Sequence, residues 1–352
     1  MRLGCWSLLA LGIAAAACAG TIGPVIPSVQ VLVVLDSLDD TLRIIPVDSP
    51  GVVHRVALQS GAFSKHALAL RGQFAAIGLG RNALSYDLAA RRTICQTVIL
   101  DPSSQTGLIN SLAFTDDGSQ VLAAITSTNI TGEFLPGNCN SGAVLVRSPV
   151  AFVSARSTFF TIAGKPPACD PLPALCPELP SWLSTPADSI PLSLPGNAQG
   201  GVLASDGLLY VINAGRGRLA NARLSQVDPV SKIEQSVYNG FGTLPQYITT
   251  DGDRVFVASA LEGLMVYNTR TRLVERSASS PIALFGSPRG LAADDVGRVY
   301  ALIAGGCTST GAPGSVQLFG ADLVSKHGPN LGRCPVAIGV TDIPSTLYRF
   351  DD

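Results

Sequence analysis

Short apolar runs alternate with tight polar turns along almost the whole chain, and the pattern recurs about every 45 residues. Each unit reads as an apolar run, an Asp-Gly or related turn, a second apolar run, a Gly-rich turn, a third apolar run and a polar loop. The turn glycines Gly207, Gly252 and Gly297 are each 45 residues apart. A fixed period with four short strands per unit is typical of a β-propeller, so the pattern predicts an all-β ring of four-stranded blades.

The apolar runs predict two clear strands in each of six units. The second strands are expected at residues 31–36, 74–78, 121–126, 208–213, 255–259 and 299–304. The third strands are expected at residues 42–47, 83–88, 143–147, 223–228, 264–268 and 315–319. Six units favour six blades. Because Asp117 and Asp206 are 89 residues apart, nearly two periods, a seventh blade is the alternative to a long insertion in this interval.

The two ends of the chain complete one blade in this arrangement. The first unit lacks a first strand, whereas residues 335–341 form an apolar run that no further unit follows. Pairing of these N- and C-terminal strands would close the ring and remove its open edges. We therefore expect one propeller domain over residues 29–352, with a Cys- and Pro-rich insertion at about residues 165–186 that reads as a loop.

Residues 1–18 have the features of an export signal. Arg2 precedes an apolar stretch, residues 8–17, that is too short to span a bilayer as a helix. The sequence Ala-Ala-Ala-Cys-Ala-Gly around Cys18 resembles a bacterial lipobox, which implies a lipid on Cys18 and a tether over residues 19–28. Since no Asp follows Cys18, the outer membrane is the expected destination in a cell with two membranes. The alternative is ordinary secretory cleavage, which leaves a soluble secreted or periplasmic protein.

The cysteine count agrees with export to an oxidising compartment. Apart from Cys5 and Cys18, six cysteines remain, and an even number predicts three disulfides. No CxxC motif or nearby pair of histidines indicates zinc. The six candidates are Cys95, Cys139, Cys169, Cys176, Cys307 and Cys334.

Position in the repeat suggests how some of these cysteines pair. Cys307 follows a second strand and Cys334 precedes a first strand, and both places lie on one face of a propeller, so we expect Cys307–Cys334. Cys139 and Cys169 hold comparable places around an earlier blade. A local pair between Cys169 and Cys176 competes with that pairing.

Two units resemble the YVTN repeat, whose core is Tyr-Val-Thr-Asn followed by Val-Ser-Val-Ile-Asp. Residues 209–215 read Leu-Tyr-Val-Ile-Asn-Ala-Gly, and residues 224–228 read Leu-Ser-Gln-Val-Asp. Residues 255–259, Val-Phe-Val-Ala-Ser, are similar when taken with Met-Val-Tyr-Asn at residues 265–268. The resemblance implies a bacterial surface or periplasmic propeller related to the NHL and lactonase types, without implying one activity.

Composition and short motifs exclude several functions. The net charge is −1 and no basic run occurs, which argues against nucleic-acid binding. The G-x-G-x-x-A matches at residues 78–83 and 215–220 precede strands rather than helices, so they indicate turns instead of a dinucleotide site. Asp-Gly turns could suggest calcium, but they are also the preferred chemistry of tight hairpins. We therefore expect no cofactor, with calcium as the alternative.

Polar residues recur where the first strands are expected to enter the central channel. Such a ring could hold an anion or a polar ligand, with Arg289 as its charged anchor. The alternative is a water-filled channel mouth in which these side chains satisfy backbone groups. The candidates are His66, Asn110, Gln199, Gln246 and Arg289, with Pro335 in the closing blade.

Three functions remain open. The absence of a Gly-x-Ser-x-Gly nucleophile motif, the insertion, and loops such as residues 127–140 and 308–314 favour a non-catalytic envelope protein. It would bind a protein or a surface polymer through a propeller face and its loops. The second function is a lactonase- or hydrolase-type enzyme acting at the channel, although the polar ring lacks a carboxylate. The third is a sensor of a small polar ligand or anion at the same ring.

Overall fold

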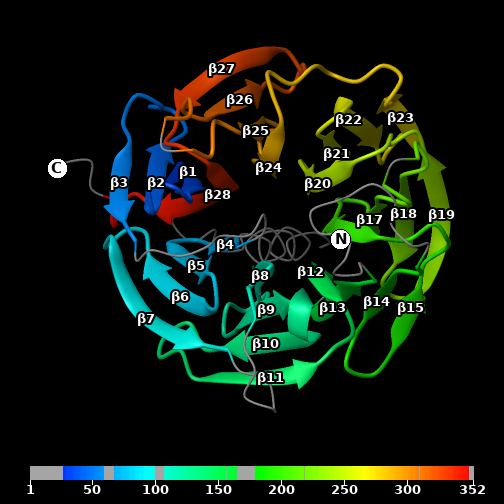
Figure 1. Ribbon diagram of the computed structural model, residues 1–352, viewed down its shortest axis with the longest axis horizontal. Coiled ribbons are helices and arrows are strands. Elements are labelled where there is room, and N and C mark those ends of the chain that lie inside the picture. The colour runs from blue at the N-terminus through cyan, green and yellow to red at the C-terminus, as the bar shows by residue number, and fades with distance from the viewer. Residues whose placement is uncertain are drawn as a thin grey trace, which may run out of the picture.

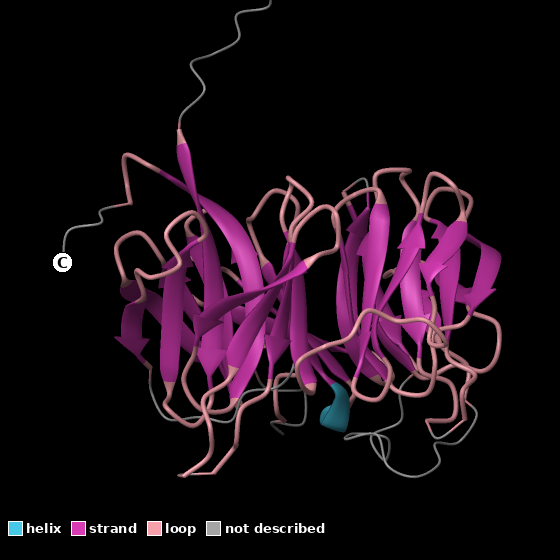
Figure 2. Ribbon diagram, turned by 90° about the horizontal axis from the view of Figure 1, so that it is seen from above, coloured by secondary structure: helices cyan, strands magenta, loops and turns pink. Residues whose placement is uncertain are grey.

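The strands of the computed structural model form seven sheets, which are arranged as the blades of a ring (Figure 1). Each sheet has four antiparallel strands that run between the two faces of the ring (Figure 2). The fold is an all-β propeller, as the sequence pattern predicts. The described residues are 27–58, 67–99, 107–155, 157–164, 179–217, 219–308 and 310–348.

In each blade the strands follow one another from the centre of the ring outward. Blade 1 consists of β28 (Pro335–Pro344), β1 (Ser28–Asp36), β2 (Thr41–Pro46) and β3 (His54–Ala57). Blade 2 consists of β4 (Leu68–Arg71), β5 (Phe74–Leu79), β6 (Asn82–Asp87) and β7 (Arg92–Val98). Blade 3 consists of β8 (Ser111–Phe114), β9 (Val121–Ile125), β10 (Ile130–Phe134) and β11 (Ser141–Leu145), with the 3-10 helix η1 (Thr126–Thr128) after β9.

The remaining four blades follow in chain order. Blade 4 consists of β12 (Pro149–Ala155), β13 (Thr158–Ala163), β14 (Trp182–Ser184) and β15 (Ser189–Pro191). Blade 5 consists of β16 (Ala198–Leu203), β17 (Leu209–Asn213), β18 (Arg223–Asp228) and β19 (Ile233–Asn239). Blade 6 consists of β20 (Pro245–Thr250), β21 (Arg254–Ser259), β22 (Gly263–Asn268) and β23 (Leu273–Arg276). Blade 7 consists of β24 (Pro288–Ala293), β25 (Val299–Ile303), β26 (Ser315–Phe319) and β27 (Ser325–Asn330).

The ring has seven blades, which is the alternative that the sequence left open, rather than the favoured six. Blade 4 fills the long interval between two Asp-Gly turns, and its β14 lies inside residues 165–186, which the sequence pattern predicts to be a loop. Residues 143–147, predicted as a third strand, overlap β11, the fourth strand of blade 3. The third strand is β10, so residues 127–140 are not one loop.

The second strand of a blade is buried on both faces because it packs between two neighbouring blades. In β17, Leu209 and Val211 share a cluster with Phe160 of blade 4. The alternate residues Tyr210 and Ile212 share a cluster with residues of blade 6 instead. This two-sided burial explains the high apolar content of the chain.

The Asp-Gly turns join first to second strands on one face of the ring, which we call the turn face. Asp206 accepts a hydrogen bond from the Leu208 N–H at 3.0 Å and another from the Tyr210 hydroxyl at 2.8 Å. Asp294 similarly accepts from the Arg298 N–H at 2.7 Å and from the Tyr300 hydroxyl at 2.9 Å. These aspartates therefore act within the turn, as hairpin chemistry predicts.

The chain ends close the ring as expected. β1 pairs antiparallel with β28 from Ser28↔Pro344 to Leu35↔Ala337. Beyond this ladder, the Ser37 N–H donates to the Cys334 carbonyl at 3.0 Å.

Two disulfides lie among the described residues. Cys307–Cys334 is confirmed. Cys139 is bonded to Cys95. A disulfide between Cys139 and Cys169, which their comparable places suggested, is therefore wrong. Cys95 lies on β7 and Cys139 in the loop after β10, and only the packing of blade 2 against blade 3 brings them together. Cys169 and Cys176 lie outside the described residues.

The signal segment and Cys18 also lie outside the described residues. Within the described ranges, no helix has the length and apolar character needed to cross a membrane.

A buried ion pair supports the closing blade. The Arg43 guanidinium contacts Asp36 through its Nε, and the two residues are 4% and 0% exposed. The Gly332 N–H, from the loop before β28, donates to the same Asp36 oxygen at 3.2 Å. Burial raises the pKa of Asp36, against the effect of Arg43 and the Gly332 N–H. The pair therefore links β1 and β2 to the C-terminal end of the chain.

We expect Asp36→Ala to lower the free energy of unfolding by about 3–5 kcal/mol, because it leaves the Arg43 charge buried without its main partner. Urea unfolding followed by intrinsic fluorescence measures the change. The double variant Asp36→Leu, Arg43→Met should regain most of the loss, since it removes both charges together. An unfolding midpoint for Asp36→Ala equal to that of the natural chain would show that the pair does not support closure.

Candidate functional site

The proposed channel residues occupy one repeated backbone position. Gln199, Gln246 and Arg289 each lie at a register shift, where the first strand carries one residue more than the second strand. Asn110 directly precedes the corresponding strand β8. His66 lies outside the described residues.

Blades 4 and 1 have the same register shift in their first strands, but there it falls on an apolar residue. In blade 4 it falls on Val150, which could not be predicted because the sequence pattern does not reveal this blade. In the closing blade it falls on Val336 rather than Pro335, since Pro335 pairs with Asp36. The ring of polar residues is therefore interrupted twice.

Two of the polar channel residues bind backbone groups. Asn110 accepts from the Thr126 N–H at 3.0 Å. Gln199 is fully buried and donates to the Asn197 carbonyl at 3.1 Å. Arg289, in contrast, is exposed. A small cavity of about 70 Å³ lies between first strands, and its lining residues are Leu68, Tyr247, Ile248, Gly290, Leu291, Ala337 and Ile338.

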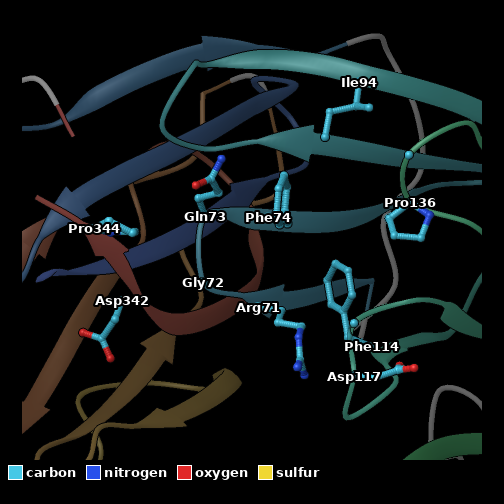
Figure 3. A pocket seen from close by; sticks show the side chains of 12 residues that line it. Arg71, Gly72, Gln73, Phe74, Ile94, Phe114, Asp117, Pro136, Asp342 and Pro344 are labelled. Carbon is cyan, nitrogen blue, oxygen red and sulfur yellow. The ribbon is translucent and has the colours of Figure 1, made fainter. Parts of the chain in front are cut away.

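A much larger cavity of about 490 Å³ lies on the turn face, between blades 2 and 3, and we call it the 2–3 groove (Figure 3). Turns from both blades contribute to it, together with β7 of blade 2 and the end of β28 of blade 1. Its lining residues are Arg71, Gly72, Gln73, Phe74, Ile94, Phe114, Asp117, Gly118, Pro136, Gly137, Asp342 and Pro344.

Aromatic and aliphatic side chains form much of the 2–3 groove. Phe74 is the first residue of β5 and is 39% exposed. Phe114, at the end of β8, and Ile94, on β7, are half-buried. In Figure 3 the two phenylalanine rings lie between Pro136 on one side and Asp342 with Pro344 on the other. The groove thus offers an apolar surface bordered by charge.

The Cys95–Cys139 disulfide fixes the outer wall of the groove. It joins β7 to the loop after β10, with 5.7 Å between the two Cα atoms. Ile94 directly precedes one cysteine, and Pro136 lies in the loop that contains the other. The Pro136 carbonyl oxygen is 3.5 Å from the Cys95 sulfur. The walls contributed by the two blades are therefore covalently linked.

The inner end of the groove depends on the closing strand. The Thr341 hydroxyl donates to the Gly72 carbonyl at 2.9 Å, which holds β28 against the β4–β5 turn. Asp342 and Pro344 follow directly along the same strand. Three blades therefore position the groove.

The two carboxylates of the groove, Asp117 and Asp342, have pKa values that are shifted in opposite directions. The Thr115 hydroxyl at 2.6 Å and the Ser119 N–H and hydroxyl at 3.0 and 2.8 Å donate to Asp117, which lowers its pKa to about 2. Arg71 donates to the Thr115 carbonyl at 3.0 Å.

Asp342 differs from Asp117. Although Asp342 is exposed, partial desolvation raises the pKa of its carboxyl, and the nearby carboxylates of Asp295 and Asp294 raise it further. No ion pair links Asp342 to another described residue. Its carboxylate lies near Asp295 and near Asp294, and Asp294 is paired with the Arg298 guanidinium at 2.5 Å.

The described residues contain no group of three or more His, Cys, Asp or Glu side chains that could hold a metal ion.

Comparison with known proteins identifies the fold. No protein-family model matches the sequence, and no curated protein matches it. Among solved structures, hydrazine synthase from Kuenenia stuttgartiensis aligns over 75% of this chain and 86% of its own, with a TM-score of 0.56 and 11% identity. Apo AztD from Citrobacter koseri aligns over 90% of this chain and 99% of its own, with a TM-score of 0.52 and 10% identity.

A third similar structure is dihydro-heme d1 dehydrogenase NirN in complex with DHE, which aligns over 88% of this chain and 74% of its own. Its TM-score is 0.50 and its identity 13%. These propeller proteins have varied roles, and at such identities the likeness concerns the fold alone.

The 2–3 groove was not predicted from the sequence. One available signal was Phe74, a large aromatic residue immediately after a turn, where an exposed position is expected. Asp342 gave no such signal, because only ring closure brings the end of the chain next to blades 2 and 3.

We expect Asp342→Asn to stabilise the protein at neutral pH, because the folded state raises the pKa of this carboxyl and so disfavours its charged form. The advantage should shrink as the pH falls through the Asp342 titration, and it should vanish once the carboxyl is protonated in both folded and unfolded chains. Thermal unfolding between pH 3 and pH 8 measures this trend.

Asp322→Asn is the matched control, because this exposed aspartate lies in the turn after β26 and asparagine keeps the acceptor for the Val324 N–H. A melting temperature of Asp342→Asn that is below that of the natural chain at pH 7 would contradict the prediction.

Proposed function

We propose that this chain is a non-catalytic binding protein of the cell envelope that holds a protein partner in the 2–3 groove. The observation that supports this most is a groove of about 490 Å³ with an exposed aromatic surface, whose walls are joined by a disulfide. Clefts of this size, with a few polar groups among apolar side chains, are typical of binding sites. A surface polymer is the alternative partner.

The proposed location follows from the sequence. An export signal over residues 1–18, a lipid on Cys18 and the resemblance to YVTN and NHL repeats favour an exported, membrane-anchored propeller. The disulfides agree with an oxidising compartment. The alternative of a soluble secreted or periplasmic protein keeps the same groove.

A lipid on Cys18 would bring the groove close to the membrane. Ser28 pairs with Pro344, which lines the groove, so the tether would join the ring at this face. Ten residues span at most about 35 Å when fully extended. A partner in the groove would then be an envelope protein near the membrane surface.

A polar-ligand site at the channel is the weaker proposal. Two of its polar residues bind backbone groups and two of its positions are valines, although Arg289 is exposed.

A photo-crosslinking amino acid at position 74 should yield a discrete adduct with an envelope protein in intact cells, because Phe74 presents its ring in the groove. Gel electrophoresis and mass spectrometry identify the adduct. The matched control carries the same amino acid at Leu273, which is 63% exposed on the outer strand of blade 6. No adduct at position 74, or the same adducts from both positions, would count against the groove as the binding site.

Cys18→Ser should abolish incorporation of a fatty-acid analogue and move the protein from the membrane fraction to the soluble fraction. Metabolic labelling and fractionation measure these two effects. Cys5→Ser is the control and should leave both unchanged. Soluble, unlabelled natural protein would favour ordinary secretion.

A further inference from the structure

We propose that the 2–3 groove binds an extended peptide segment in which a lysine or arginine neighbours a large apolar residue. Asp342 would receive the cation, and Phe74 and Phe114 would contact the apolar side chain. This inference rests on the proposed function and adds the chemistry of the partner.

The first argument is the apolar surface. Phe74 is the exposed large apolar side chain of the groove, and neighbouring Phe114 and Pro136 extend the same surface (Figure 3). Aromatic side chains bury a large area at low entropic cost, and they often dominate the energy of an interface. A peptide side chain placed between the two rings would remove this area from water.

The second argument is charge complementarity. The lining contains two carboxylates and one guanidinium, and Asp295 lies near Asp342, whereas the charge of Asp294 is paired with Arg298. Arg298 donates to Asp294 through its Nε and to the Gln30 amide oxygen, and Gln30 in turn donates to Asp295. A cation from a partner would supply the countercharge that Asp342 lacks among the described residues.

The third argument is the separation of the two ends of the groove. Arg71 lies at the Asp117 end, where it donates to Thr115 and packs against Gly118. Asp342 lies on the closing strand at the opposite side of the groove from Asp117, with Arg71 and the phenylalanine rings between them (Figure 3). The carboxylate that has no ion-pair partner among the described residues therefore lines the same groove as the apolar surface, which matches a basic residue near an apolar one.

The fourth argument is preorganisation. The Cys95–Cys139 bond and the Thr341–Gly72 hydrogen bond fix the walls before any partner arrives. A preformed site avoids part of the entropic cost of binding, which suits a short extended segment. A membrane surface suits this groove less well, because anionic lipid headgroups would be repelled by Asp117 and Asp342.

A library of random heptapeptides displayed on phage provides an unbiased test against the immobilised full-length protein. We expect selected peptides to be enriched in Lys or Arg adjacent to Phe, Leu or Ile. Fluorescence anisotropy of the leading synthetic peptides then gives their affinities. Asp342→Asn and Phe74→Ala should each weaken binding at least about tenfold, whereas Asp322→Asn should leave the affinity unchanged.

Replacing the basic residue of the peptide by glutamate should also abolish binding to the natural chain. Circular dichroism of each variant establishes that the fold is retained. Should Phe74→Ala fail to fold, Asp342→Asn alone carries the test, since this substitution removes only an uncompensated charge.

The outcomes separate this inference from the proposed function. Peptides that need Phe74 but not Asp342, and that carry no basic residue, would overturn the inference and leave the groove as a partner site. If no selected peptide requires Asp342 for binding, the inference is wrong, whatever the crosslinking shows. Vesicles of phosphatidylethanolamine and phosphatidylglycerol are the second probe, and Asp342-dependent binding to vesicles alone would assign the groove to the membrane instead. Failure of both peptide selection and crosslinking at position 74 would remove the proposed function as well.

Discussion

The pairing of β1 with β28 is the constraint on which the rest of the structure depends. Because this ladder joins the two ends of the chain, each blade has a neighbour on both sides. Strands such as β17 can then bury alternate residues against two different blades, which is how an uninterrupted apolar strand becomes stable. The buried pair of Asp36 and Arg43 lies at the end of this ladder and also contacts the loop before β28. Closure is therefore supported by backbone pairing, apolar packing and a buried charge interaction at one place.

Closure also creates the 2–3 groove. Arg71 and Phe74 lie in blade 2, whereas Asp342 and Pro344 belong to the last strand of the chain. The Thr341 hydroxyl ties that strand to the β4–β5 turn, and the Cys95–Cys139 bond ties blade 2 to blade 3. The inner and outer ends of the groove are thus fixed by two independent links. An opened ring would lose the carboxylate while keeping the aromatic residues.

Sequence patterns predicted those parts of the fold that depend on local chemistry. The Asp-Gly turns mark their blades because the aspartate binds groups within the same hairpin, as Asp206 and Asp294 do. The closing strand was evident because a first strand was missing at one end and left over at the other. Blade 4 escaped detection because its β12–β13 turn has no Asp-Gly and because β14 and β15 have three residues each. The Cys95–Cys139 bond and the 2–3 groove were not predicted, since both depend on how blades pack side by side.

The contrast between the channel and the groove shows where a repeat protein can gain a specific site. Asn110 and Gln199 recur at one place in the repeat, and their side chains satisfy backbone groups there, so their polarity serves the fold. Phe74 and Asp342 have no such role: one exposes an aromatic ring at the start of a strand, and the other is an exposed carboxylate with no ion-pair partner among the described residues. An apolar and cationic partner would cover both groups. Residues that depart from the repeat and satisfy no backbone group are therefore a stronger indication of binding than residues that follow the repeat.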